Sequence, residues 1–366
     1  MSYSRRKTLA MIGGGTLVAA GAGGAVWANT RAPSRALAPW GEAGAPNDHR
    51  LAALSYAILA PNPHNLQPWM VGLEGTDTAT LWRDPSKALP MTDPADRQVV
   101  IGLGCFLEQA RIAATMTGHA VETELWPDGV DGPVAAMRFA SGAARDPLAD
   151  AIMDRRSCKE PFGPEALSEE DIAALAAVAD RVVTDPAEVE AIKAITLEAW
   201  TIEAYTPRTM KESADLMRFG RREIEANPDG IDMGGPMLEG LHLAGLLDAQ
   251  SVVDPESSAF AEGARMYDEM LRATPAYTVI IGADGPEDRI EAGRRYLRLN
   301  LAATAAGVSL HPVSQALQEF PEMAGPYAAI HERLAPGGGT VHMLARAGYG
   351  PAVPRTPRWP LEAKML

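Results

Sequence analysis

The chain has little cysteine, few histidines and no excess of positive charge, and each shortage excludes a class of protein. Only Cys105 and Cys158 are cysteines among 366 residues, too few for a disulfide framework or a cysteine-rich metal site. The seven histidines are scattered without H-x-x-x-H or H-E-x-x-H spacing, so we expect no bound metal. A formal net charge of -14 argues against nucleic acid or an anionic membrane surface as the main partner.

The composition is that of a globular protein, with 46% hydrophobic and 22% charged residues, enough for one large core or two fused smaller ones. The first 28 residues differ from the rest. Arg5 and Arg6 precede an apolar run rich in Gly and Ala, Ala10 to Ala28, which ends in Val26-Trp27-Ala28. This pattern predicts a twin-arginine (Tat) signal over residues 1–28, the Tat export machinery as a partner and a periplasmic location. The alternative is an uncleaved membrane anchor. The Tat route carries folded proteins, often with a cofactor already bound.

The rest of the chain divides into a linker rich in Ala, Pro and Gly, residues 29–47, and two halves, residues 48–149 and 150–366. Apolar periodicity, together with the capping sequence Ser168-Glu169-Glu170-Asp171, predicts the helices and the apolar runs predict the strands. The expected helices are 49–60, 99–117, 168–179, 187–205, 209–226 and 291–306, and the expected strands are 69–73, 277–281 and 341–345.

Residues 227–260 have a different character, with many Gly, Met and Pro residues and little alternation. Such a segment is either a lid over a site or a long surface excursion.

An internal repeat is visible at the end of two helices. Ala110-Arg-Ile-Ala-Ala-Thr-Met-Thr-Gly118 aligns with Leu299-Asn-Leu-Ala-Ala-Thr-Ala-Ala-Gly307, and each precedes a short extended stretch. The repeat suggests two related halves joined in one chain.

The first motif with chemical potential is the loop Ala60-Pro-Asn-Pro-His-Asn-Leu-Gln-Pro-Trp69. Its prolines stiffen the connection, and Asn65 and Gln67 present two carboxamides. A carboxamide both donates and accepts hydrogen bonds, which matches the edge of a flavin ring. The alternative is a rigid helix-to-strand connection with Trp69 in the core. The candidate ligand-binding residues of this loop are Pro63, His64, Asn65 and Gln67.

The second motif, Asp154-Arg-Arg-Ser-Cys-Lys-Glu-Pro-Phe162, gathers three cations and a hydroxyl. Two guanidinium groups with a serine form a suitable cradle for a phosphate. A lysine two residues past the serine could reach another part of the same ligand. The alternative is a solvated basic turn. The candidates are Arg155, Arg156, Ser157 and Lys159.

Two further stretches are weaker. Arg355 and Arg358 stand among prolines in the tail Gly348-Tyr-Gly-Pro-Ala-Val-Pro-Arg-Thr-Pro-Arg358, which could equally be a solvated tail. The stretch Gly307 to Gln315 turns at Pro312, and the backbone N–H groups that follow could donate to a ligand acceptor such as flavin N5. The candidates there are Pro312, Val313 and Ser314.

Taken together, these motifs resemble the nitroreductase family. The loop is similar to its S-x-x-N-x-Q-P-W loop, and the run from Arg155 to Lys159 to its R-R-S-x-R/K element. The Ala-Ala-Gly307 helix end with Pro312 and the Gly-Tyr-Gly…Pro-Arg-x-x-Arg close fit its C-terminal part. The whole chain is most similar to the double-length, single-chain Acg-like group.

The order of the motifs departs from ordinary family members, in which the R-R-S element precedes the N-x-Q-P-W loop. Here it follows the loop, and the second half has no such loop of its own. Ordinary members are homodimers with FMN at the interface. The resemblance therefore implies an α+β nitroreductase-like fold, with two fused half-domains around a mixed or antiparallel sheet and a helical core. It also implies a monomer that is an internal pseudo-dimer, with one FMN per chain held by both halves.

The resemblance implies an FMN-dependent oxidoreductase that passes hydride or electrons through flavin N5 between a small-molecule or protein donor and acceptor. The cofactor supplies the chemistry, so no protein residue is expected to be catalytic. Lys159 is the candidate cation near flavin N1/O2, and Arg155, Arg156, Ser157, Arg355 and Arg358 are the candidates for the phosphate. A flavin storage protein with segment 227–260 as its lid is the first alternative, and a binding protein without flavin the second.

Overall fold

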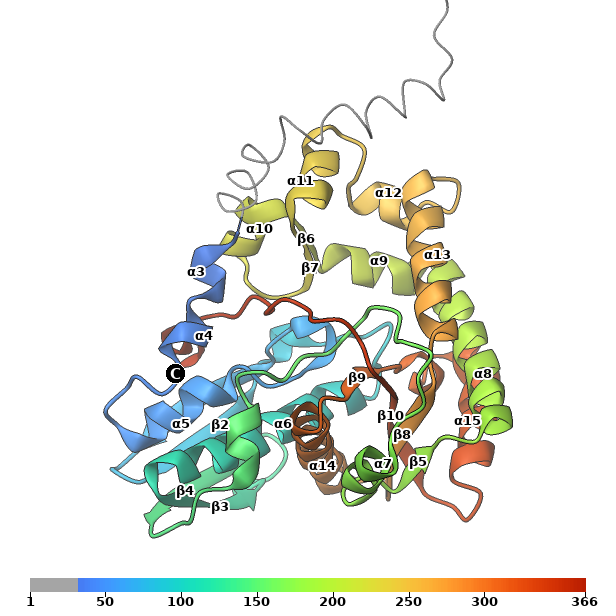
Figure 1. The fold of residues 1–366 in the computed structure, drawn as a ribbon. Helices are drawn as coiled ribbons and strands as arrows, with labels where there is room; N and C mark the ends of the chain where they lie inside the picture. Colours follow the sequence, from blue (N-terminus) through green and yellow to red (C-terminus); the bar gives the residue numbers. More distant parts are fainter. Residues whose placement is uncertain (1–31) are drawn as a thin grey trace, which may run out of the picture.

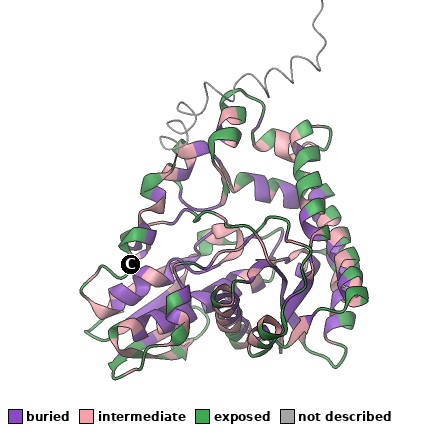
Figure 2. Ribbon diagram, in the orientation of Figure 1, coloured by how far each residue is buried: buried purple, intermediate pink, exposed green. Residues whose placement is uncertain are grey.

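The structure is a computed structural model, and it describes residues 32–366. Two four-stranded antiparallel sheets each carry one long helix, and these two helices pack against each other at the centre (Figure 1). Buried residues concentrate in the sheets and the central helices, whereas α11 to α13 are mostly exposed or half-buried (Figure 2). The predicted α+β architecture of two fused halves is confirmed. The predicted signal, residues 1–28, lies outside the described residues.

The first half runs helix, hairpin, helix, hairpin, and its sheet has the order β1-β2-β4-β3. Asp48 caps α5 by accepting from the N–H groups of Arg50 and Leu51. The expected helix 99–117 is α6, continued by the short turn η3, Thr115–Thr117. The elements are α5 His49–Ala57, β1 Trp69–Glu74, β2 Thr78–Arg83, α6 Arg97–Ala114, β3 His119–Leu125 and β4 Ala135–Ser141.

The second half repeats this order, and its sheet has the order β5-β8-β10-β9. Ser168 caps α7 by accepting from the Asp171 N–H, as the capping sequence predicts. The topology of each strand pairing matches that of the first half. The elements are α7 Glu169–Ala176, β5 Arg181–Val183, β8 Ala276–Gly282, α14 Pro286–Ala305, β9 Ser309–Pro312, α15 Ala324–Leu334 and β10 Thr340–Gly348.

The predicted repeat is confirmed by the geometry of the two long helices. Gly118 and Gly307 end the repeated segments with nearly equal φ angles, +75° and +74°. Two further glycines, Gly104 of α6 and Gly293 of α14, touch each other. Each stands the same number of residues before the glycine that ends its repeated segment. A Cβ on Gly104 would lie 2.1 Å from the Ile290 carbonyl oxygen, and one on Gly293 would lie 2.0 Å from that of Ile101.

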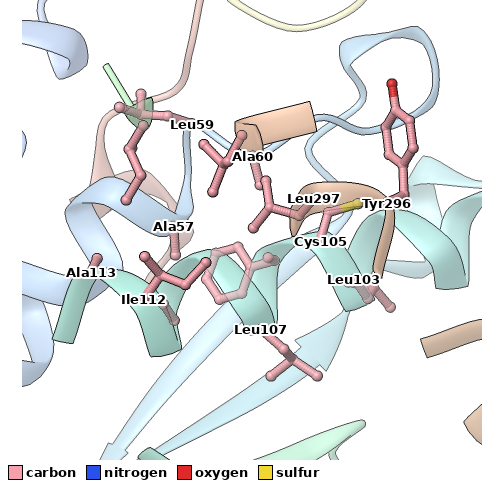
Figure 3. Close-up of a cluster of buried hydrophobic side chains, with 14 of the residues drawn as sticks. Ala57, Leu59, Ala60, Leu103, Cys105, Leu107, Ile112, Ala113, Tyr296 and Leu297 are labelled. Atoms are coloured by element: carbon pink, nitrogen blue, oxygen red, sulfur yellow. The ribbon is translucent and has the colours of Figure 1, made fainter. Parts of the chain in front are cut away.

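These contacts are reciprocal, because Ile101 and Ile290 are also equivalent positions of the repeat. Reciprocal contacts between equivalent residues are the property of a two-fold interface. The Cys105 thiol reinforces the crossing by donating to the Gly293 carbonyl at 3.2 Å. Figure 3 shows Cys105 and Leu107 of α6 in one apolar cluster with Leu297 of α14 and Ala57 of α5.

A large insertion between β5 and β8 distinguishes the second half. The prediction of a single helix over residues 209–226 is wrong, because the segment is divided into α9, β6 and α10. The helix is interrupted where β6 pairs in parallel with β7 and where Gly220 adopts φ +70°. Segment 227–260 is structured and holds β7, α11 and α12. The elements are α8 Pro186–Tyr205, α9 Pro207–Asp215, β6 Met217–Phe219, α10 Gly220–Ala226, β7 Ile231–Met233, α11 Pro236–Leu243, α12 Ala249–Val253 and α13 Ser258–Arg272.

The described part of the expected linker is folded. Residues 34–42 form two short helices, α3 Ser34–Leu37 and α4 Pro39–Glu42. Ala36 and Trp40 are 2% exposed, so apolar burial, which composition alone does not reveal, fixes this segment to the body.

The C-terminal tail crosses back to the first half, where the chain ends near α4 and α5 (Figure 1). Met365 bridges Val71 of β1, and the Leu366 N–H donates to the Val71 carbonyl at 2.9 Å. The alternative of a solvated tail is wrong at Arg358, which is 3% exposed.

Candidate functional site

The proline-rich loop of the first half has an unusual backbone. His64, Asn65 and Gln67 have φ angles of +46°, +56° and +54°, a left-handed region that side chains other than glycine rarely occupy. The Asn62 carboxamide oxygen supports this shape by accepting from the Gln67 N–H at 2.8 Å. Such strain persists only where the surrounding structure enforces it, and it concentrates at functional sites.

The two carboxamides of this loop bond to other parts of the chain. Gln67 is fully buried; its Nε2 donates to the Pro228 carbonyl at 2.7 Å, and its Oε1 accepts from the Trp359 N–H at 2.9 Å. Asn65 donates to the Pro357 carbonyl at 3.1 Å and accepts from Arg358. The Gln67 carboxamide therefore ties the loop to the tail and the insertion, and its contact with a flavin edge stays a prediction.

Two of the predicted arginines meet at the end of α5. Arg155 Nη2 and Arg358 Nη2 both donate to the Leu59 carbonyl at 3.1 Å, and Arg358 also donates to the Ala60 carbonyl at 3.2 Å. The start of the second half, the C-terminal tail and the first-half loop thus come together at one point.

The other two arginines join them around the indole of Trp40. The guanidinium carbons of Arg156, Arg355 and Arg358 lie 4.7, 5.4 and 5.9 Å from the centre of the Trp40 ring. Arg156 donates to the carbonyls of Met153 and Arg155. The structure therefore brings all four predicted arginines into one cluster. We name this cluster the unpaired group; its members are Arg155, Arg156, Arg355 and Arg358.

In residues 32–366, no carboxylate lies within ion-pair distance of any arginine of the unpaired group, and three buried Nε atoms, of Arg155, Arg156 and Arg358, have no partner. Burial, then repulsion from Arg155 and Arg156, lowers the pKa of Arg358 to about 9. Burial, then repulsion from Arg355, lowers the pKa of Arg156. Guanidiniums crowded in this way have an unmet need for an anion, and a phosphate satisfies it.

Ser157 and Lys159 follow Arg156 in the chain, and this segment runs beside β9. Ser157 bridges Leu310, and the Cys158 N–H donates to the Leu310 carbonyl at 3.0 Å. Burial lowers the pKa of Lys159, with Asp232 opposing the shift, although the lysine keeps exposed surface. The Lys159 side chain is therefore partly exposed and partly desolvated by its neighbours.

His64 and Asp232 share the surroundings of Lys159. Burial, then the Lys159 cation, lowers the pKa of His64 to about 4, so this imidazole is neutral near pH 7. Burial raises the pKa of Asp232 against the pull of Lys159. The first half, the second half and the insertion therefore each contribute one titratable side chain to this group, His64, Lys159 and Asp232 respectively.

The turn after β9 meets the prediction only in part. Val313 is buried, and its N–H donates to the Leu344 carbonyl at 2.8 Å, so this N–H is not available to a ligand and the prediction for Val313 is wrong. Pro312 ends β9, and Ser314 precedes the turn η5, Gln315–Leu317. Their ligand contacts stay predictions.

Three residues near the site were not expected from sequence. His311 is 4% exposed, its Nδ1 lies 3.3 Å from Arg346 Nη1, and burial, followed by Arg346, holds its pKa well below the ordinary value. His311 stands in the stretch Gly307 to Gln315, which was already a candidate for ligand binding, so its position could have been recognised from the sequence. Trp40 and Asp232 lie in segments interpreted as a linker and a lid, and no sequence signal connected them to the motifs.

No group of three or more His, Cys, Asp or Glu side chains among residues 32–366 could hold a metal ion. In the same part of the chain, α6 and η3 together are long and apolar enough to cross a membrane, but 83% of the apolar window is buried in the body.

Comparison with known proteins finds relatives along most of the chain. A Mycobacterium tuberculosis H37Rv protein named as an NAD(P)H nitroreductase is 25% identical over 328 residues, covering 83% of this chain and 87% of that protein. PigM of Serratia, also named as an NAD(P)H nitroreductase, is 24% identical over 293 residues, covering 73% and 80%. Acg of M. tuberculosis is 31% identical over 116 residues, covering 30% and 35%. The predicted resemblance to the nitroreductases is confirmed by these relatives.

Among solved structures, the FMN-dependent nitroreductase NfnB of Mycobacterium smegmatis in complex with NADPH has a TM-score of 0.37 at 19% identity, covering 59% of this chain and 96% of that one. A nitroreductase of Bacteroides fragilis with bound FMN has a TM-score of 0.32 at 12% identity, covering 57% and 90%. No family model matches the chain.

Proposed function

We propose that the protein is an FMN-dependent oxidoreductase of nitroreductase type, with one FMN per chain between the two halves. The observation that carries the proposal is the unpaired group, four arginines from two distant segments that have no carboxylate partner within residues 32–366. The names of the relatives, NAD(P)H nitroreductases, support the reaction class.

The residues present fit FMN. Its phosphate is a dianion that matches Arg155, Arg156, Arg355 and Arg358, and the orphaned Nε atoms of three of them supply donors. Ser157 follows directly in the chain and adds a hydroxyl. Lys159 lies next along the same segment and acts electrostatically on His64, so the ring would lie beside these two residues.

When bound, FMN accepts and delivers hydride. The chain would supply binding and electrostatics: the unpaired group would hold the phosphate, and Lys159 would provide a cation for the negative charge that accumulates on reduction. His64 is neutral and can donate or accept a hydrogen bond without adding charge. The strained loop holds His64 where the Lys159 charge acts on it.

A second candidate, flavin storage, is favoured by the attachment of the insertion to the loop. The Gly230 N–H donates to the Asn65 carbonyl at 3.2 Å, and Pro228 accepts from Gln67. Asp229 binds Lys87 at 2.7 Å and the Trp359 indole N–H at 2.9 Å. An insertion fixed in this way beside the site would restrict access to a bound ring.

The experiment that tests the proposal uses the purified folded protein. We expect a yellow protein that releases one FMN per chain on denaturation and whose flavin is reoxidised by a nitroaromatic or quinone acceptor after reduction. Colourless protein that also fails to take up FMN would overturn the proposal. Bound FMN that no added donor or acceptor reaches would favour storage.

For the cellular context we propose export through the Tat machinery to the periplasm, as a monomer whose halves take the place of two subunits. Nicotinamide cofactors are scarce there, so the physiological donor would be another small molecule or a protein. Replacing Arg5 and Arg6 with Lys should hold the protein in the cytoplasm, measured by fractionation; unchanged export would contradict this location.

A further inference from the structure

Residues 33–42, here named the strap, run across the tail and reach the insertion. The Arg358 N–H donates to the Ala36 carbonyl at 2.8 Å, and the Trp40 indole N–H donates to the Thr356 carbonyl at 2.8 Å. Arg35 forms an ion pair with Glu225 of α10 at 3.1 Å. The strap is therefore fixed at three points to segments that come from far along the chain.

Trp40 is the part of the strap that meets the unpaired group. Its ring is 2% exposed and lies within 5.9 Å of three guanidinium carbons, those of Arg156, Arg355 and Arg358. The negative face of an aromatic ring attracts cations, and indole does so best. Trp40 therefore compensates part of the mutual repulsion of these arginines and holds their heads together.

We propose that Trp40 is a cofactor-binding residue that closes the phosphate end of the FMN site and controls how fast FMN leaves. This inference rests on the proposed function. An anion bound by Arg156, Arg355 and Arg358 has the Trp40 ring next to it, since the ring contacts all three. Release at this end then requires the strap to move away from the tail, which breaks its bonds to Thr356 and Arg358.

The ion pair between Arg35 and Glu225 acts as an outer latch of the strap. The Arg35 side chain is 80% exposed, so its removal leaves the packing of the body intact. The Glu225 side chain is 7% exposed but keeps a second partner, Arg221 at 3.2 Å, so we expect a small effect from loss of the exposed Arg35 and a larger one from loss of the ring.

The test measures FMN release from the full-length protein with an excess of a flavin-binding scavenger, followed by fluorescence. Trp40→Leu, which keeps apolar volume and removes the ring, should release FMN about tenfold faster. Arg35→Ala should accelerate release by about twofold. Arg208→Ala is the matched control, because it removes an exposed ion pair, with Glu322, outside the strap, and it should release FMN as the wild type does.

Riboflavin, which lacks the phosphate, separates closure of the phosphate end from general loosening. Its release should be the same from the wild type and Trp40→Leu. Equal acceleration of riboflavin and FMN, or unchanged FMN release, would overturn the inference. If Trp40→Leu does not fold, Trp40→Phe, which keeps a ring but loses the bond to Thr356, should release FMN about threefold faster, and an unchanged rate would overturn it. A wild-type chain that takes up no FMN would instead overturn the proposed function.

Discussion

Two groups of arginines lie between the halves, and they differ in one respect. In the first, here named the paired group, Arg111 of α6 and Arg298 of α14 share the carboxylates of Glu108 and Asp146 at 2.8 to 3.2 Å. In the unpaired group, four arginines from the start of the second half and the tail share backbone carbonyls, one carboxamide and the Trp40 ring.

The pKa directions express this difference. The Glu108 carboxylate raises the pKa of Arg111, whereas burial and neighbouring cations lower the pKa of Arg358 to about 9. A basic group whose pKa is raised in the folded state stabilises the fold, and a basic group whose pKa is lowered there costs stability. The paired group therefore joins the two halves, and the unpaired group is the one whose charge a bound anion would compensate.

The largest expected effect is on the unpaired group. Changing Arg156 and Arg355 together to Ala removes two charge-assisted hydrogen bonds to the phosphate, about 3–6 kcal/mol of FMN affinity, or roughly a hundred- to ten-thousandfold. The ligand-free protein should lose less than about 1 kcal/mol of stability, because relief of repulsion offsets the lost backbone bonds. Titration calorimetry and urea unfolding measure the two quantities.

The matched control for the double variant is Arg298→Ala in the paired group, which should keep the FMN affinity and lower the stability. If the double variant unfolds easily and still binds FMN, the two groups have been assigned the wrong way round.

A buried acid without a cation provides the next comparison. Glu203 of α8 is 4% exposed and accepts from Gln318 at 3.1 Å; burial raises its pKa to about 7, and Glu212 contributes to the rise. The folded state then holds more protons than the unfolded state between about pH 4.5 and pH 7, so stability falls as the pH rises through this window. The loss should approach about 3 kcal/mol above pH 7.

Glu203→Gln should remove this slope, which urea unfolding at pH 5 and pH 8 would measure. Glu198→Gln is the control at an exposed position of the same helix. An identical slope in Glu203→Gln and the wild type would show that Glu203 is not the group responsible.

The paired group gives the third prediction. Glu108→Gln replaces a 4% exposed carboxylate that serves two arginines, and Asp146 remains to hold them. We expect a loss of about 2 kcal/mol in the free energy of unfolding, because a charged hydrogen-bond partner is removed from a buried position. FMN affinity should stay within about twofold of the wild type. A large loss of affinity at unchanged stability would mean that this group also serves the ligand.

The sequence predicted the features that depend on local patterns. Ser168 could be linked to a helix start because a cap acts within three residues. The repeat ending at Gly118 and Gly307 could be seen because both ends share one backbone conformation. The clustering of basic residues at Arg155 and Arg156 was likewise visible.

The features that sequence did not predict depend on contacts between distant segments. Gln67 bonds to Pro228 and Trp359, which no local pattern connects to it. Trp40 stands in a stretch whose composition is that of a linker, and its burial follows only from the path of the tail. Strands β3 and β4 alternate in burial, but their many polar and small residues hide the period.

The smallest expected effect concerns Lys159, which belongs to neither group of arginines. Its side chain keeps exposed surface, and the carboxylate of Asp232 opposes its charge. Changing Lys159 to Met keeps the length of the side chain and removes the charge. If Lys159 lies beside the part of the flavin that becomes anionic on reduction, its loss should lower the midpoint potential, because the cation favours the reduced form more than the oxidised form. Solvent screening limits the shift to on the order of 20–60 mV. Arg156→Ala should weaken FMN binding yet leave the potential nearly unchanged, because the phosphate end is remote from the ring. Spectroelectrochemical titration of both variants measures the shifts. Equal shifts in the two variants would mean that the phosphate and ring ends are misplaced along the run from Arg155 to Lys159, and the distinction between a binding group and a ring-side cation would then have to be abandoned.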